Sequence, residues 1–226
     1  IAIDHPLPGI SPDSSLAGFR LADVAERTFD VDYVNNETGA PGPDGVVDAS
    51  GTHFLNLSSL LTARDNLRQS VADLILLSRS VGLVDLDGDS GTDEIDESRI
   101  AFVGHSLGGI VGSTLLGVNE EIGAGTLAMP GGGIAKLLDG SLAFGPVVAA
   151  GLASAGFLEG GDTFETFLRF AQLTLDTADP INHAVAARAN RSIFYKGGRP
   201  ATVAEVYANL TRTSGGGEAV RRRGAA

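Results

Sequence analysis

The chain has 226 residues, of which 43% are hydrophobic, and it contains no long uninterrupted apolar run. Length and composition therefore predict one globular domain over residues 1–226, without a transmembrane segment. The 28 acidic and 16 basic residues give a net charge of −12, which disfavours nucleic acid and anionic membranes as partners. The absence of cysteine excludes disulfides and thiol chemistry but leaves the cellular compartment open.

The N-terminal part is irregular in pattern. Residues 1–9 are typical of the end of a buried strand that runs into a loop, which predicts a chain that begins inside a longer fold. Residues 29–34 alternate in polarity like an exposed strand, and residues 35–45 form a loop dense in turn residues. We interpret residues 29–45 as an excursion from the core.

A long helix is predicted next. Ser58 or Ser59 is suited to its N-cap, apolar residues recur at helical spacing from Leu60 to Val81, and Gly82 ends it.

An acidic loop follows this helix, with aspartates at alternate positions and glycines between them. Such spacing brings hard oxygen ligands onto one cation, so a structural Ca²⁺ site is one hypothesis and a solvated acidic turn is the other. Ser90 stands where an EF-hand loop requires glycine. The predicted ligands are Asp85, Asp87, Asp89, Asp93 and Asp96.

The segment Gly104-His105-Ser106-Leu107-Gly108 follows the apolar run 99–103 and precedes a helical pattern. A G-x-S-x-G sequence between a strand and a helix is typical of a nucleophile elbow, in which a sharp turn exposes the serine hydroxyl. Ser106 is therefore the candidate nucleophile. The alternative is an ordinary strand, turn and helix with an incidental serine.

The same turn predicts an oxyanion donor. The backbone N–H of Leu107 lies at the start of the predicted helix, where it can stabilise the negative charge of a tetrahedral intermediate. The second donor normally comes from a loop after an earlier strand, and the sequence does not identify that loop.

Beyond the elbow helix, residues 123–130 form the next predicted strand, and this alternation of strand and helix favours a parallel sheet. Residues 131–178 contain successive apolar helical patterns without a strand between them. We interpret them as a helical cap, rich in phenylalanine, that favours an apolar acyl group over a charged substrate. The alternative, which is favoured for any single helix, is that they are packing helices.

The chain has four histidines from which a general base can be drawn. His5 and His53 precede Ser106, and His105 is the variable residue of the elbow. His183 follows Ser106, and Asp179 four residues before it would lie beside the imidazole on a helix. The alternative, which the residues favour, is that Asp179 caps a helix starting at Pro180 and that His183 is a surface or packing residue.

Residues 191–196 form the last predicted strand, and residues 213–226 are predicted to be a disordered tail. Neither a carboxylate in residues 197–202 nor a histidine after His183 is present to supply the usual acid and base at this end of the chain.

Three segments in this order, 51–57, 61–69 and 104–109, resemble a bacterial extracellular lipase family of the α/β-hydrolase superfamily. The resemblance covers about residues 1–195. It implies a secreted enzyme that hydrolyses carboxylic esters, including lipids, with a Ser-His-Asp triad. It also implies that this chain is truncated at both ends of the hydrolase sheet.

We therefore expect an α/β fold with a parallel sheet core, and a serine esterase that needs no cofactor for its chemistry. Two alternatives remain. The first is a catalytically incomplete hydrolase fragment that binds ligands or forms a homo-oligomer through exposed sheet edges. The second is a serine peptidase, which would use the same elbow.

Overall fold

The computed structural model describes residues 1–56, 59–91, 94–189 and 192–196. They form two compact units, an N-terminal unit from Ile1 to Ser70 and a C-terminal unit from Val71 onwards, and the boundary falls inside helix α1. Among the described residues, no helix combines the length and apolarity needed to cross a membrane.

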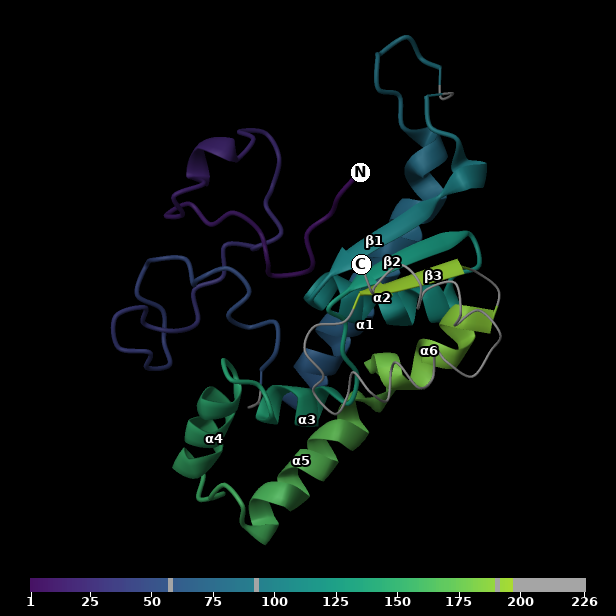
Figure 1. The fold of residues 1–226 in the computed structure, drawn as a ribbon. Helices are drawn as coiled ribbons and strands as arrows, with labels where there is room; N and C mark the ends of the chain where they lie inside the picture. Colours follow the sequence, from purple (N-terminus) through teal and green to yellow (C-terminus); the bar gives the residue numbers. More distant parts are fainter. Residues whose placement is uncertain (57–58, 92–93, 190–191, 197–226) are drawn as a thin grey trace, which may run out of the picture. The chain divides into compact units, whose positions relative to one another are not determined.

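In the C-terminal unit α2 connects β1 to β2, and α3 to α6 lie between β2 and β3 (Figure 1). Short 3-10 turns cover Ala17–Phe19, Val81–Leu83, Glu97–Arg99 and Asp176–Ala178. The helices are α1 (Leu60–Ser80), α2 (Leu107–Val118), α3 (Ile134–Asp139), α4 (Gly145–Ser154), α5 (Asp162–Leu175) and α6 (Pro180–Ala189). The strands are β1 (Ala101–His105), β2 (Ala124–Ala128) and β3 (Ser192–Lys196).

The three strands form one parallel sheet in the order β1-β2-β3. Val103 pairs with Thr126, and Thr126 pairs with Phe194, so each of the three strands is in register with its neighbour. Parallel strands need crossover connections, and helices α2 to α6 supply them. The predicted α/β architecture with a parallel sheet and flanking helices is confirmed, as are the strands predicted within 123–130 and 191–196.

Helix α2 packs closely on the sheet because glycines at the contact place no side chain between the helix and the strands. A Cβ atom on Gly112 would overlap the Phe102 ring of β1, and one on Gly125 of β2 would overlap a methyl group of Leu116. Leu115 and Leu116 have no exposed surface. One part of the core of the C-terminal unit therefore lies between α2 and one face of β1 and β2.

The N-terminal unit contains mainly turns and irregular backbone. The strand predicted at residues 29–34 is wrong, because Phe29 and Asp30 have φ angles of 54° and 47°, which an extended strand cannot accommodate. Only an isolated bridge between Val34 and Pro41 is present there. Carboxylates organise this loop instead, and Asp32 accepts hydrogen bonds from the N–H groups of Asp44 and Gly45.

The helical segment between β2 and β3 is held at one buried side chain, Asp179. One carboxylate oxygen accepts the N–H groups of Gly133 (2.8 Å) and Ile181 (2.9 Å). The other accepts the N–H of Ile134 (2.7 Å) and the side-chain amide of Gln172 (2.8 Å). The start of α3, the body of α5 and the start of α6 therefore meet at one carboxylate.

We expect Asp179→Ala to lower the free energy of unfolding by about 3 kcal/mol, because it leaves the buried N–H of Ile134 and the partly buried N–H groups of Gly133 and Ile181 without an acceptor. Urea denaturation followed by circular dichroism measures this loss. Glu159→Ala, which removes an exposed carboxylate between α4 and α5, serves as the control. An equal effect of the two substitutions would contradict the role assigned to Asp179.

Candidate active site

Ser106 occupies the sharp turn that joins β1 to α2. Its φ and ψ angles are 51° and −114°, a combination that costs a residue with a side chain about 1–3 kcal/mol. The turn is fixed on both sides, because the Ser106 N–H donates to the Ala128 carbonyl of β2 (2.9 Å) and the Ser106 carbonyl accepts the N–H of Ile110 (2.9 Å). The residue is exposed. The structure therefore contains the strained strand-to-helix turn that the G-x-S-x-G pattern indicates.

The two glycines of the turn have different roles. A Cβ atom on Gly104 would overlap the carbonyl oxygen of Gly108, and it would lie 2.7 Å from the Phe102 ring. A Cβ atom on Gly108 would meet no described atom within 4 Å. Only Gly104 is therefore required for the backbone to fold back on itself.

The Leu107 N–H lies where an oxyanion donor is expected. Leu107 is the first residue of α2, and the N–H groups of the first helical turn have no acceptor within the helix. The positive end of the helix dipole adds to their attraction for negative charge. This N–H directly follows the serine, which is the arrangement that the elbow motif predicts.

His183 and Asp179 lie away from this turn. The backbone and Cβ of His183 pack against Gly117, in the last turn of α2, whereas Ser106 precedes the first turn. At 1.5 Å per residue the two ends are about 15 Å apart. The His183 Nε2 atom lies 3.2 Å from the Thr177 carbonyl oxygen. The structure therefore does not bring His183 to Ser106, and the Asp179 carboxylate is bonded to Gly133, Ile134, Gln172 and Ile181 instead.

Asp179 instead has the alternative role that the sequence favoured. Pro180 is the first residue of α6, and the Asp179 carboxylate accepts the Ile181 N–H, as an N-cap does.

A pair that sequence reasoning did not name lies in the N-terminal unit. His53 Nε2 is 2.6 Å from an oxygen of the buried Asp48 carboxylate, which also accepts the Tyr33 N–H (2.8 Å). The edge of the Tyr33 ring meets the His53 ring, with centroids 5.4 Å apart. Asp48 and His53 are five residues apart in sequence. This separation gives no signal of their pairing, because irregular backbone brings them together.

Two opposed effects set the pKa of Asp48. Burial alone would raise it, but the hydrogen bonds from Tyr33 and His53 favour the charged carboxylate more strongly, so the pKa is below its ordinary value of 3.8. Asp48 is therefore ionised at neutral pH and can hold His53 in one orientation.

The other two histidines, His105 and His5, belong to different units of the chain. His105 ends β1, with its side chain on the opposite face of the strand from Gly104, and is exposed. In the N-terminal unit the His5 ring lies 5.9 Å from that of Phe54.

The acidic loop brings four carboxylates together in a different set from the predicted one. Ligand oxygens of Asp85, Asp87, Asp89 and Glu94 all lie within 4.8 Å of one another and could hold a metal ion. Asp96 is not among them, and its carboxylate accepts the Ser98 N–H at the start of a 3-10 turn. Asp93 lies outside the described residues.

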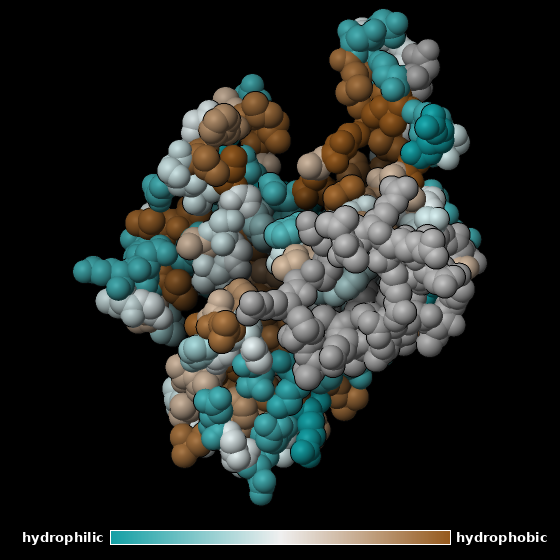
Figure 2. All heavy atoms as spheres, viewed as in Figure 1, coloured by the Kyte–Doolittle hydropathy of each residue, from teal (hydrophilic) through white to brown (hydrophobic). Residues whose placement is uncertain are grey.

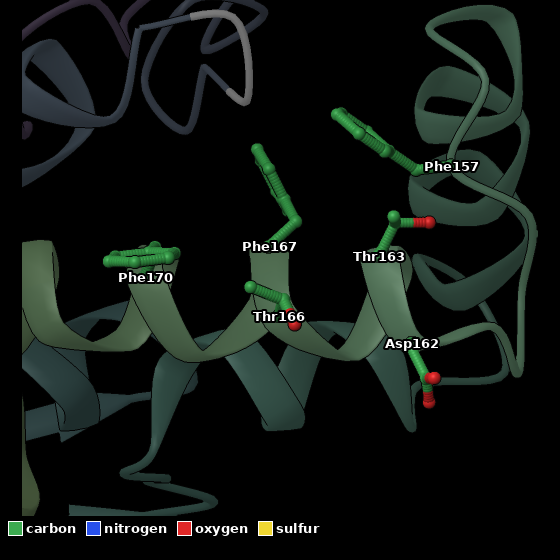
Figure 3. A pocket seen from close by; sticks show the side chains of 6 residues that line it. All are labelled: Phe157, Asp162, Thr163, Thr166, Phe167 and Phe170. Atoms are coloured by element: carbon green, nitrogen blue, oxygen red, sulfur yellow. The ribbon is translucent and has the colours of Figure 1, made fainter.

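An apolar groove of about 320 Å³ lies on α5 and the loop before it (Figure 3). The rings of Phe157 and Phe167 stack across it with centroids 5.8 Å apart. Phe157, Asp162, Thr163, Thr166, Phe167 and Phe170 line it.

No family model, curated protein or solved structure matches this chain. The resemblance to lipases therefore depends on the sequence motifs alone.

We expect Gly104→Ala to destabilise the protein and to remove any reactivity of Ser106, because the added methyl group must displace the Gly108 carbonyl. Gly108→Ala is the matched control, since it adds the same methyl group to open space within a helix and is expected to cost nothing or to stabilise by up to about 1 kcal/mol. Thermal unfolding compares the two variants. Equal melting temperatures would contradict this account of the turn.

Proposed function

We propose that the protein is a carboxylic ester hydrolase of the α/β-hydrolase type with Ser106 as its nucleophile. The observation that carries the proposal is the exposed serine at a φ of 51°, in a turn fixed by hydrogen bonds between the end of one parallel strand and the start of a helix. Strain of this kind collects at functional sites, and an ordinary connection would not need it.

The proposed reaction has two steps. The Ser106 hydroxyl oxygen attacks the ester carbonyl, its proton passes to a base, and the alcohol leaves with a proton to give an acyl-enzyme. Water then attacks the acyl-enzyme by the same route and releases the acid and the serine. The Leu107 N–H and the start of α2 stabilise the oxyanion in both steps, and one such donor contributes about 3 kcal/mol.

The position of His183 argues against it as the base. The sequence predicts His183 as the base and Asp179 to orient it, but His183 packs at the opposite end of α2 from Ser106.

Apolar acyl esters are the proposed substrates. The segment between β2 and β3 carries the groove lined by Phe157, Phe167 and Phe170, which suits a hydrocarbon chain better than a charged group. The motif resemblance to bacterial extracellular lipases supports the same substrate class and a secreted enzyme.

We expect a fluorophosphonate to label the wild-type protein stoichiometrically, as measured by intact mass, and not to label Ser106→Ala. Only a serine activated by a base reacts rapidly. Ser154→Ala, which removes an exposed hydroxyl from α4, should label like the wild type. Absence of labelling in the wild type would overturn the proposal and favour a catalytically incomplete module.

Substrate panels separate the two enzyme classes. Hydrolysis of short p-nitrophenyl esters without cleavage of peptides supports an esterase, whereas efficient peptide cleavage would make the protein a serine peptidase.

We further propose that the acidic loop binds a structural Ca²⁺ ion and takes no part in the chemistry. Asp85, Asp87 and Asp89 offer oxygens at alternate positions, and Glu94 adds a later carboxylate. The loop precedes β1, so an ion there would stabilise the chain just before the nucleophile strand.

Calcium at 100 times its dissociation constant is expected to stabilise the native protein by about 2.7 kcal/mol. We expect Ca²⁺ to raise the melting temperature of the wild-type protein. Asp87→Asn should lose this rise, and Asp73→Asn should retain it. Wild-type protein whose melting temperature does not respond to Ca²⁺ would leave the loop as a solvated acidic turn.

A further inference from the structure

Helix α4 is unusual for a helix on a protein surface, because it has no polar face. No Asp, Glu, Lys or Arg occurs between Gly140 and Leu158. Val148 and Leu152 are buried on one side of α4. The exposed side carries apolar and small residues in place of the charged residues that normally face water: Pro146, Val147, Ala150, Gly151, Ala153 and Ser154.

Large apolar side chains project from this segment. Leu142 is 99% exposed, and Phe144, Val147 and Leu158 are 57%, 66% and 66% exposed. Brown spheres reach the surface in the lower part of Figure 2, where α4 and α5 lie in Figure 1. A helix that is apolar all round is normally covered by protein or by lipid.

Charge decides between the candidate partners. The uncharged segment is followed by the exposed carboxylates Glu159 and Asp162, and the whole chain has a net charge of −12. Two copies of so acidic a chain repel each other, and an anionic membrane or nucleic acid would be repelled as well. A surface without net charge fits both the apolar face and its acidic border.

We propose that α4 and the turn before it, residues 140–158, form a docking face for an uncharged lipid surface such as a zwitterionic phospholipid layer. Leu142, Phe144 and Val147 enter the boundary between headgroups and acyl chains, and the remaining helices stay in water. This inference rests on the proposed ester hydrolysis, since it places the enzyme at the surface where apolar acyl esters collect.

Flotation with phosphatidylcholine vesicles tests the face without any turnover. Ser106→Ala protein is used throughout, so that the result does not depend on catalysis and can fail or succeed independently of serine labelling. We expect the parent to float with the vesicles and Leu142→Asp/Phe144→Asp to partition at least about tenfold more weakly. Leu83→Asp, which changes a side chain that is 74% exposed outside the segment, should bind like the parent.

A second measurement covers the case in which the double variant fails to fold. The chain contains no tryptophan, so Leu142→Trp introduces a single fluorescent reporter. We expect its emission to shift to shorter wavelength with phosphatidylcholine vesicles, whereas that of Leu83→Trp stays unchanged.

Four results of the vesicle experiments would overturn the inference. They are absence of binding by the parent, equal binding by the double variant, an unshifted Leu142→Trp emission, and binding that strengthens as anionic phosphatidylglycerol is added. A dimer in sedimentation that Leu142→Asp/Phe144→Asp dissociates would also overturn it, because a second copy would then cover the face.

Discussion

The buried carboxylate of Asp179 is the interaction on which the arrangement of the C-terminal unit depends. It accepts four hydrogen bonds, from Gly133, Ile134, Gln172 and Ile181, and so joins α3, α5 and α6 at one point. Gly133 also ends the short loop that leaves β2, and the last residue of β2 holds the Ser106 N–H through its carbonyl. The position of the helical segment and the conformation of the nucleophile turn are therefore linked through the end of one strand.

Close approach of backbones is the second constraint on this unit. Gly104 touches the Gly108 carbonyl, Gly112 receives the Phe102 ring, and Gly117 receives His183. The three contacts fall along the length of α2, so this helix is held against β1 at its start and against α6 at its end. Glycine weakens an isolated helix by about 1 kcal/mol relative to alanine, and here packing offsets that cost.

The sequence predicted those features that depend on neighbours along the chain. The elbow, α1, β2 and β3 follow from local periodicity and turn residues, and Pro180 after Asp179 correctly indicated an N-cap. Two kinds of feature were missed: the pairing of Asp48 with His53, which irregular backbone brings together, and the joining of three helices at Asp179, which depends on contacts between distant residues. The strand expected at 29–34 failed because alternating polarity does not reveal the positive φ angles of Phe29 and Asp30. Asp96 fitted the calcium spacing, but its carboxylate lies outside the cluster and accepts the Ser98 N–H.

The backbone of Ser106 has a conformation that is strained for any residue with a side chain. At a φ of 51° glycine is the residue with the least conformational strain, so the fold by itself would favour glycine at this position over serine. A serine at this position supplies the hydroxyl group but lowers the stability of the fold, whereas a glycine would do the opposite. A lineage released from the need for the hydroxyl could gain stability by one substitution there, which makes this residue a sensitive record of whether the site is in use.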